Sequence, residues 1–141
     1  ILFERTQPVE GDFNGVLTIE GNGQLIQVNL SAQIEIPPVI EFFYSDPKVV
    51  YISNTNCGSS EATLGASIYD DANLSQVEIE WTRNNIDIIT TPLQLVSNQI
   101  WIASLSGFET GAVPSIEAKL TATDSRGNQS QASTIVGVRL C

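Results

Sequence analysis

The side chains that most often carry catalysis are scarce in this chain of 141 residues. It contains no histidine, so it lacks the commonest general base and the commonest metal ligand, and neither a Ser-His-Asp nor a Cys-His site can be built. Its 16 Asp and Glu residues could place two carboxylates at the roughly 5–9 Å separation that glycosidases use, but no spacing singles out such a pair. The sequence therefore predicts a protein that is not an enzyme.

Calcium is the cation that the available oxygen ligands would suit best. Asp70, Asp71 and Asn73 lie together in one polar stretch, and Asp124 and Asn128 lie in another. No EF-hand spacing is present, and Asp and Asn in turns usually hydrogen-bond their own backbone. We therefore expect turns at both places and no resident cofactor, with calcium at Asp70, Asp71 and Asp124 as the weaker alternative.

Two features of the sequence bear on carbohydrate. Trp101 alternates with isoleucines in a predicted strand, so one of its faces could be wet, but both faces are apolar and favour a buried or interface tryptophan. Asn-x-Ser sequons occur at Asn29, Asn73 and Asn128, about as many as chance provides in a chain this rich in Asn, Ser and Thr. Surface glycans therefore stay an alternative partner rather than the preferred one.

The composition bounds the class of protein. Hydrophobic residues make up 42% of the chain and charged residues 16%, which is typical of a globular domain of ordinary size. The net charge of −10 argues against nucleic acid and anionic lipid as partners. No apolar run approaches the ~20 residues that span a bilayer, so we expect no membrane insertion. The chain does not begin with Met, so we expect a mature or excised piece.

Apolar and polar residues alternate through most of the chain, which predicts β-strands, and no segment shows a helical period. Between residues 77 and 82, for example, Val77, Ile79 and Trp81 share one face while glutamates occupy the other. Strands separated by turn residues every 8 to 12 positions or so are typical of a β-sandwich. The predicted strands are 39–44, 48–53, 61–69, 77–82, 86–89, 93–96, 100–105, 116–122 and a last strand that ends near Leu140.

The last hairpin resembles a known family. Residues 116–128 read IEAKLTATDSRGN, which is similar to the last hairpin of bacterial-type immunoglobulin-like and fibronectin-like surface domains. Trp81 looks like the core tryptophan on the third strand of such domains. The resemblance is close over 116–141 and loose over 37–141. It implies an immunoglobulin-like antiparallel β-sandwich in an extracellular, cell-surface setting, although the antibody-type cysteine pair and the tyrosine corner are both missing.

Cys57 and Cys141 match no metal or redox spacing, so a disulfide and two buried thiols are the alternatives. In a seven-stranded antiparallel sandwich the first and last strands run the same way and end at the same pole. Cys57 follows the predicted first strand and Cys141 ends the last, so the two residues should meet. We favour the disulfide, which would indicate an oxidising, extracellular compartment.

The segment before the sandwich predicts a β-hairpin over residues 14–36, because Asn22-Gly23 fits a type I′ turn. An isolated two-stranded hairpin is marginally stable at best, so this one needs a partner sheet. The partner could be the following domain, a truncated preceding domain or another subunit. The returning strand carries six alternating apolar residues, namely Ile26, Val28, Leu30, Ala32, Ile34 and Ile36.

Residues 1–13 predict an extended arm. Ile1, Phe3 and Val9 share one phase, as in a strand that completes a neighbour's open sheet. These considerations together predict a non-catalytic structural or adhesive module, a self-assembling cell-surface or pilus-like filament subunit whose partners are other copies of itself. The alternative is a carbohydrate-binding or spacer module of a larger secreted protein. The candidate subunit contacts are Ile1, Phe3, Val9, Ile26, Val28 and Leu30.

Overall fold

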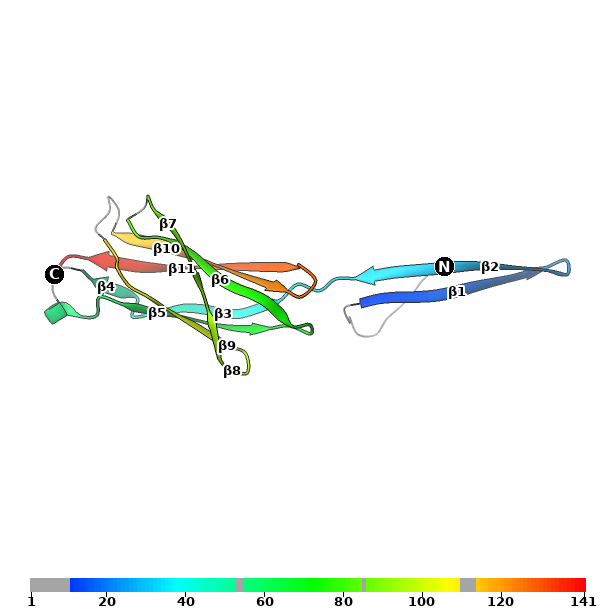
Figure 1. The fold of residues 1–141 in the computed structure, drawn as a ribbon, viewed down its shortest axis with the longest axis horizontal. Helices are drawn as coiled ribbons and strands as arrows, with labels where there is room; N and C mark the ends of the chain where they lie inside the picture. Colours follow the sequence, from blue (N-terminus) through cyan, green and yellow to red (C-terminus); the bar gives the residue numbers. More distant parts are fainter. Residues whose placement is uncertain (1–10, 53–54, 85, 110–113) are drawn as a thin grey trace. The chain divides into compact units, whose positions relative to one another are not determined.

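The computed structural model describes residues 11–52, 55–84, 86–109 and 114–141, and its described elements are β-strands and one short 3-10 turn. This confirms the prediction of an all-β fold. The chain divides into two compact units, residues 1–36 and residues 37–141. Figure 1 shows the hairpin of the first unit and the strands of the second.

The first unit is built on one antiparallel pair, β1 (Gly11–Gly21) and β2 (Gln24–Ile34). Asn22 and Gly23 connect the strands with φ values of 52° and 74°, and two positive values are what a type I′ turn requires. The strand β1 begins at Gly11, whereas the sequence predicted an arm as far as residue 13, because the ladder continues until Gly11 lies opposite Ile34. The predicted arm contacts Ile1, Phe3 and Val9 lie outside the described residues.

The second unit contains two sheets. One has the strand order β3-β5-β9-β8 and the other β4-β11-β10-β6-β7, and every pairing is antiparallel except that of β4 with β11. The strands of the first sheet are β3 (Val39–Asp46), β5 (Ala62–Tyr69), β9 (Ile100–Leu105) and β8 (Gln94–Ser97). Those of the second are β4 (Val49–Tyr51), β11 (Gln129–Arg139), β10 (Ser115–Asp124), β6 (Leu74–Thr82) and β7 (Ile88–Pro92).

Two short strands lie further along the chain than predicted. The sequence indicated strands at 86–89 and 93–96, whereas β7 and β8 each begin and end later. The bounds of β7 are set by its pairing with β6. Trp81 of β6 lies opposite Ile89, and the ladder continues as far as Pro92. The apolar pattern within residues 86–96 does not indicate which strand they pair with.

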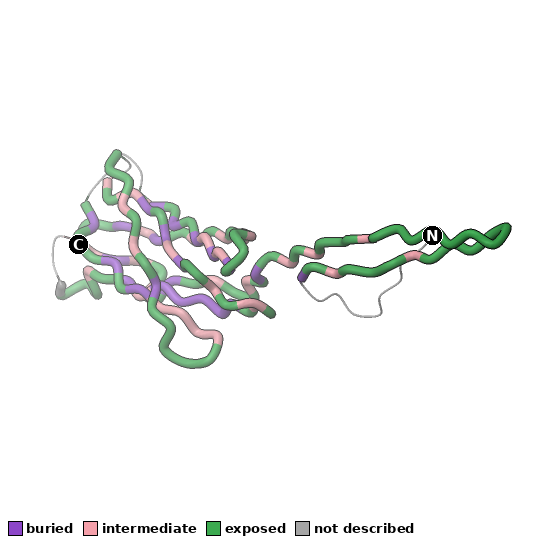
Figure 2. The backbone as a smooth tube through the Cα atoms, turned by 45° about the vertical axis from the view of Figure 1, so that its right-hand side comes forward, coloured by how far each residue is buried: buried purple, intermediate pink, exposed green. Residues whose placement is uncertain are grey.

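One hydrophobic core lies between the two sheets. The predicted inward residues of β5 and β6 are all buried, and β10 and β11 contribute the facing side chains. Trp81 is only 3% exposed, and its indole N–H donates to the Thr91 hydroxyl at 3.1 Å while its ring lies 5.2 Å from that of Phe108. Figure 2 shows how strongly burial is concentrated in this unit. The fully buried side chains on the inner faces include Leu64, Ala66, Ile79, Leu105, Ala118, Leu120 and Val136.

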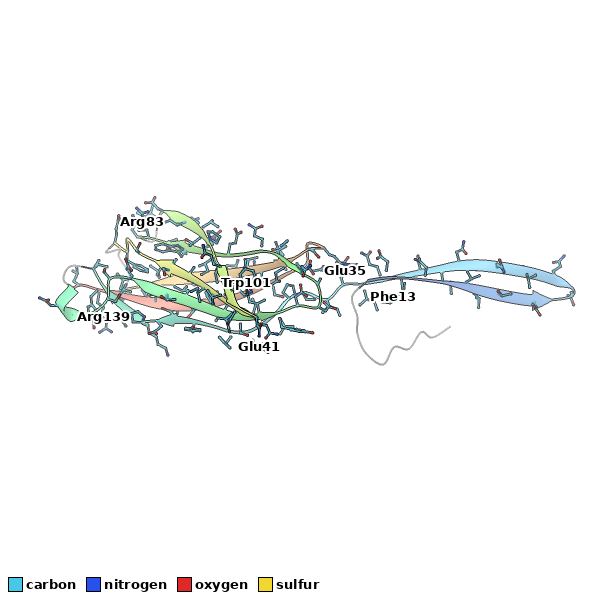
Figure 3. All side chains as sticks on the ribbon, turned by 60° about the horizontal axis from the view of Figure 1, so that its bottom comes forward. Phe13, Glu35, Glu41, Arg83, Trp101 and Arg139 are labelled. Atoms are coloured by element: carbon cyan, nitrogen blue, oxygen red, sulfur yellow. A yellow bond between two sulfur atoms is a disulfide. The ribbon has the colours of Figure 1, made fainter. Side chains whose placement is uncertain are left out.

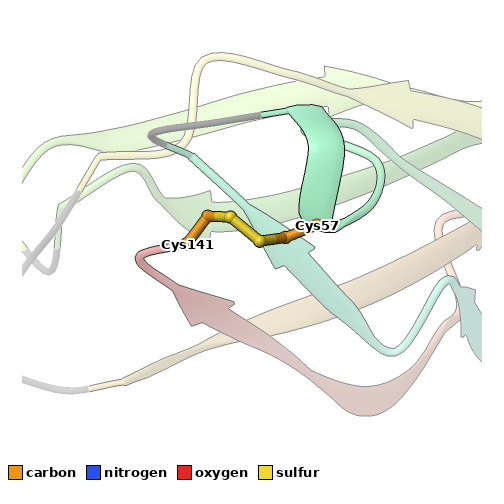
Figure 4. The surroundings of a disulfide bond; sticks show 2 residues. All are labelled: Cys57 and Cys141. Carbon is orange, nitrogen blue, oxygen red and sulfur yellow. A yellow bond between two sulfur atoms is a disulfide. The ribbon is translucent and has the colours of Figure 1, made fainter.

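The predicted disulfide between Cys57 and Cys141 is present, with the two Cα atoms 5.8 Å apart (Figure 4). The strands β4 and β11 run parallel, so both leave the sheet at the same end, and the Ile52 N–H donates to the Arg139 carbonyl at 3.1 Å just beyond them. A 3-10 turn at Thr55–Cys57 then brings one cysteine back toward the other. The expectation that the first and last strands end at one pole is confirmed.

Candidate functional site

The hairpin presents one continuous apolar face. Side chains of directly opposite residues point to the same side of an antiparallel pair, and Leu17 lies opposite Val28 while Ile19 lies opposite Ile26. Leu30 extends the same face toward the base of the hairpin. We call these five residues the hairpin apolar face.

The hairpin apolar face is largely open to solvent. The exposed fractions are 55% for Ile26, 49% for Ile19 and 41% for Val28. Figure 2 shows that almost the whole hairpin is exposed. The opposite side of the hairpin is mostly polar, with Val16 and Leu25 as its apolar exceptions, and carries Asn14, Thr18, Glu20, Gln27, Asn29, Ser31 and Gln33. The predicted contact candidates Ile26, Val28 and Leu30 therefore lie together on the side that water solvates least well.

A second apolar surface lies on the outer side of the sheet that contains β3, β5 and β9. Phe42 and Tyr44 of β3 are exposed there with ring centroids 5.9 Å apart, and Tyr69 of β5 is exposed on the same side. Ile100 and Ile102 of β9 continue this surface and are half-buried. We call these five residues the aromatic sheet face.

Tyr44 covers its neighbouring strand closely. The Tyr44 side chain lies over Gly65 of β5, where an added Cβ would meet its ring and hydroxyl atoms at 2.5–2.6 Å, so a larger residue at position 65 would have to displace the Tyr44 ring. Two residues further along β5, the Ser67 hydroxyl donates to a Glu41 carboxylate oxygen at 2.7 Å. Figure 3 labels Glu41, which belongs to β3. The polar group nearest the centre of the aromatic sheet face is therefore already hydrogen-bonded within the protein.

The outer side of the other sheet has the opposite character. Glu78 and Glu80 of β6 lie beside Glu117 and Lys119 of β10, with threonines around them and with the exposed Ile88 and Ile135 as apolar exceptions. Such a polar outer face is what a solvated antiparallel sheet normally presents. The apolar outer side of the first sheet is thus a property of that sheet and not of the whole sandwich.

Sequence reasoning missed the aromatic sheet face because of an irregularity in β3. The register shifts between Ile40 and Phe42, so Glu41 interrupts the alternation and Phe42 and Tyr44 turn outward while Phe43 packs against the core. The run Phe42-Phe43-Tyr44 was the available signal, because three consecutive large aromatic residues in a strand must place at least one on each side.

Trp101, the sequence candidate for carbohydrate contact, is half-buried and packs against the core, on the inner side with Ala103. Of the sequons, Asn29 lies on the polar side of the hairpin. The Asn128 amide donates to Asp124 Oδ2 at 2.8 Å, so a glycan on Asn128 would compete with that hydrogen bond.

The two acidic stretches lie side by side at one end of the sandwich. The Ser125 N–H donates to the Asn73 carbonyl at 2.8 Å, and the Ser75 hydroxyl donates to the Asp124 carbonyl at 2.7 Å. Asp124 is buried and its Oδ1 accepts the backbone N–H groups of Arg126 and Asn128, both at 2.8 Å. The predicted turn is therefore present, and Asp124 organises it.

Asp124 and Asp70 have shifted pKa values of opposite sign. Burial by itself would raise the pKa of Asp124, but the Asn128 side chain and the backbone N–H groups of residues 126–128 outweigh it and hold the pKa below its ordinary value. Burial raises the pKa of Asp70, and the charges of Asp124 and Asp71 add to the rise against an opposing effect from the Ala72 backbone N–H. Neither carboxylate oxygen of Asp70 accepts a hydrogen bond of normal geometry among the described residues.

Replacing Asp124 by alanine should lower the free energy of unfolding by about 2 kcal/mol at neutral pH, because it leaves turn N–H groups without their acceptor. A pKa depressed in the folded state means that ionised Asp124 contributes its full stability above an unfolded-state pKa of ~3.9 and loses it as the pH falls through the folded-state value. The difference in free energy of unfolding between the parent protein and Asp124→Ala should therefore decrease at acidic pH. Urea titrations at several pH values will measure it.

Asp70→Asn is the matched control for Asp124→Ala. A pKa raised in the folded state means that ionised Asp70 costs stability at neutral pH, so its neutral analogue should be at least as stable as the parent protein. Equal losses for the two variants would contradict the assignment of Asp124 as the organiser of the turn.

Within the described part of the chain, no group of three or more Asp, Glu, His or Cys side chains is arranged to hold a metal ion. Nor do the described residues form a helix long and apolar enough to cross a bilayer. In the comparisons with known proteins, no protein-family model and no curated protein matches this chain.

Proposed function

We propose that this chain is a non-catalytic extracellular module, structural or adhesive, that assembles with copies of itself at a cell surface or in a filament. The observation that carries the proposal is the hairpin apolar face, on which Ile19, Ile26 and Val28 are each about half exposed. Complete burial of such a side chain contributes about 1.5–3 kcal/mol. A contact that covers this face would thus be stabilised mainly by hydrophobic burial, and the arm, residues 1–9, would add strand complementation to it.

The strand order supports an immunoglobulin-like sandwich within this proposal. The order β3-β5-β9-β8 corresponds to strands A, B, E and D of that fold, and β11-β10-β6-β7 corresponds to G, F, C and C′. Trp81 lies on the strand that corresponds to C, where immunoglobulin domains carry their core tryptophan. The disulfide supports the extracellular setting, because such bonds persist in oxidising compartments.

Val28→Asp should abolish self-association while leaving the sandwich folded, because it places a charge at the centre of the hairpin apolar face. Sedimentation velocity over a range of concentrations measures the association, and near-ultraviolet circular dichroism checks the fold. The matched control is Gln27→Asp, which adds the same side chain one residue away on the polar side of the hairpin.

The salt dependence gives a second measurement on the same samples. Copies with a net charge of −10 repel one another, so an apolar contact should strengthen as salt is added. A parent protein that stays monomeric at every concentration and salt level would contradict the proposal.

The exposed rings of Phe42, Tyr44 and Tyr69 favour one second candidate, a carbohydrate-binding module. Sugars stack on aromatic side chains but also need polar groups that fix their orientation. Retention of the monomeric protein on immobilised polysaccharide, lost in Tyr44→Ala, would support this candidate.

A further inference from the structure

The chain carries two exposed apolar sheet surfaces of different kinds, one in each unit. We infer that they are partners: the hairpin apolar face of one copy docks on the aromatic sheet face of the next. This inference rests on the proposed self-assembly and names the surface that receives the hairpin.

The two surfaces are similar in size. A two-stranded face of 11 residues per strand is roughly 37 Å long and 10 Å wide. A three-stranded face whose longest strand has 8 residues is roughly 27 Å by 14 Å. The overlap is limited by the shorter length and the narrower width, so docking covers a footprint of roughly 27 Å by 10 Å on each copy, or about 540 Å² in total, which is the size of a weak, reversible contact.

Polarity selects this side of the sandwich over the other. The hairpin apolar face contains no charged side chain, and the aromatic sheet face has Gly65, Ser67 and isoleucines at its centre. Docking on the opposite outer side would instead desolvate Glu78, Glu80 and Glu117 without giving them new partners. The aromatic sheet face has one carboxylate near its centre, that of Glu41, and this carboxylate already accepts a hydrogen bond from the Ser67 hydroxyl.

The shapes of the two surfaces are also complementary. Gly15 lies opposite Leu30 and leaves a gap in the hairpin apolar face, since no atom lies within 4 Å of where its Cβ would be. On the other surface the Phe42 ring is exposed, whereas the Tyr44 ring lies against Gly65 of its own sheet. A ring seated over Gly15 would fill the gap.

Docking of this kind is heterologous, because each copy binds one neighbour through its hairpin apolar face and another neighbour through its aromatic sheet face. Heterologous contacts produce closed rings or open filaments and not simple two-fold dimers. The two surfaces can therefore be disabled independently, which a symmetrical contact would not allow.

The test uses two variants of the 141-residue chain. The donor variant, Val28→Asp, has a charge in its hairpin apolar face and an unchanged aromatic sheet face. The acceptor variant, Phe42→Asp/Tyr69→Asp, has charges in its aromatic sheet face and an unchanged hairpin. Both acceptor positions are exposed, and Thr90→Asp on the edge strand β7 controls for an added charge on the sandwich. Unchanged thermal unfolding of the second unit shows that each variant is folded.

Sedimentation velocity should find each variant alone at least tenfold weaker in self-association than the parent protein, and an equimolar mixture of the two should form 1:1 pairs that grow no further. If the acceptor variant alone assembles like the parent, the receiving surface lies elsewhere and this inference fails while the proposed self-assembly stands. If the parent itself is monomeric, both fail. Loss of polysaccharide binding in an acceptor variant that still assembles would assign the aromatic sheet face to carbohydrate.

Discussion

Replacing Trp81 by alanine is expected to lower the free energy of unfolding of the second unit by about 3–5 kcal/mol, the range measured for large-to-small changes at buried aromatic positions. The indole is 3% exposed between the sheets, so its removal leaves a cavity lined by Ile89, Ala118 and Phe108 that the surrounding strands cannot fully close. A urea titration measures the loss, with the fluorescence of Trp101 as the remaining reporter.

Two further variants separate the contributions to this loss. Trp81→Phe keeps most of the ring volume but removes the N–H that donates to Thr91, so it should cost much less than the alanine. Glu80→Ala, on the outer side of the same strand, should change stability by less than about 0.5 kcal/mol. A loss below about 1 kcal/mol for Trp81→Ala would contradict the packing described for β6.

Removing the disulfide by Cys57→Ala together with Cys141→Ala is expected to cost about 4–5 kcal/mol. The bond joins residues separated by 84 positions, and closing so long a loop restricts the unfolded chain strongly in the chain-entropy model. The dependence of stability on urea should also steepen in the double variant, because its unfolded state is freer to expand and exposes more surface. Urea titrations of the oxidised parent and the double variant measure both effects.

Treatment with a reducing agent provides the control. The reduced parent should unfold at nearly the same urea concentration as the double variant, and the double variant itself should not respond to the reductant. A parent protein whose unfolding midpoint is unchanged by complete reduction would show that the bond restricts the unfolded chain very little.

The sequence by itself determined the elements whose signals are local. The apolar alternation of Val77, Ile79 and Trp81 is a period of two, and that period identifies a strand and its buried side without reference to any partner. Asn22-Gly23 identified its turn in the same way, because only residues that tolerate positive φ fit it. The apolar side of the hairpin was readable for the same reason, since Ile26 and Val28 share one phase.

The tertiary structure decided what depends on distant partners. The bulge at Glu41 turns Phe42 and Tyr44 outward, and it forms where β3 pairs with β5, a strand that lies some twenty residues later in the chain. The bounds of β7 follow from its pairing with β6 in the same way. Asp124 and Asp70 differ in pKa because of the groups that the fold brings around each carboxylate. The period-two alternation of apolar residues indicates which side of a strand each side chain lies on. The strands that pair with it and pack against it determine which atoms that side chain contacts.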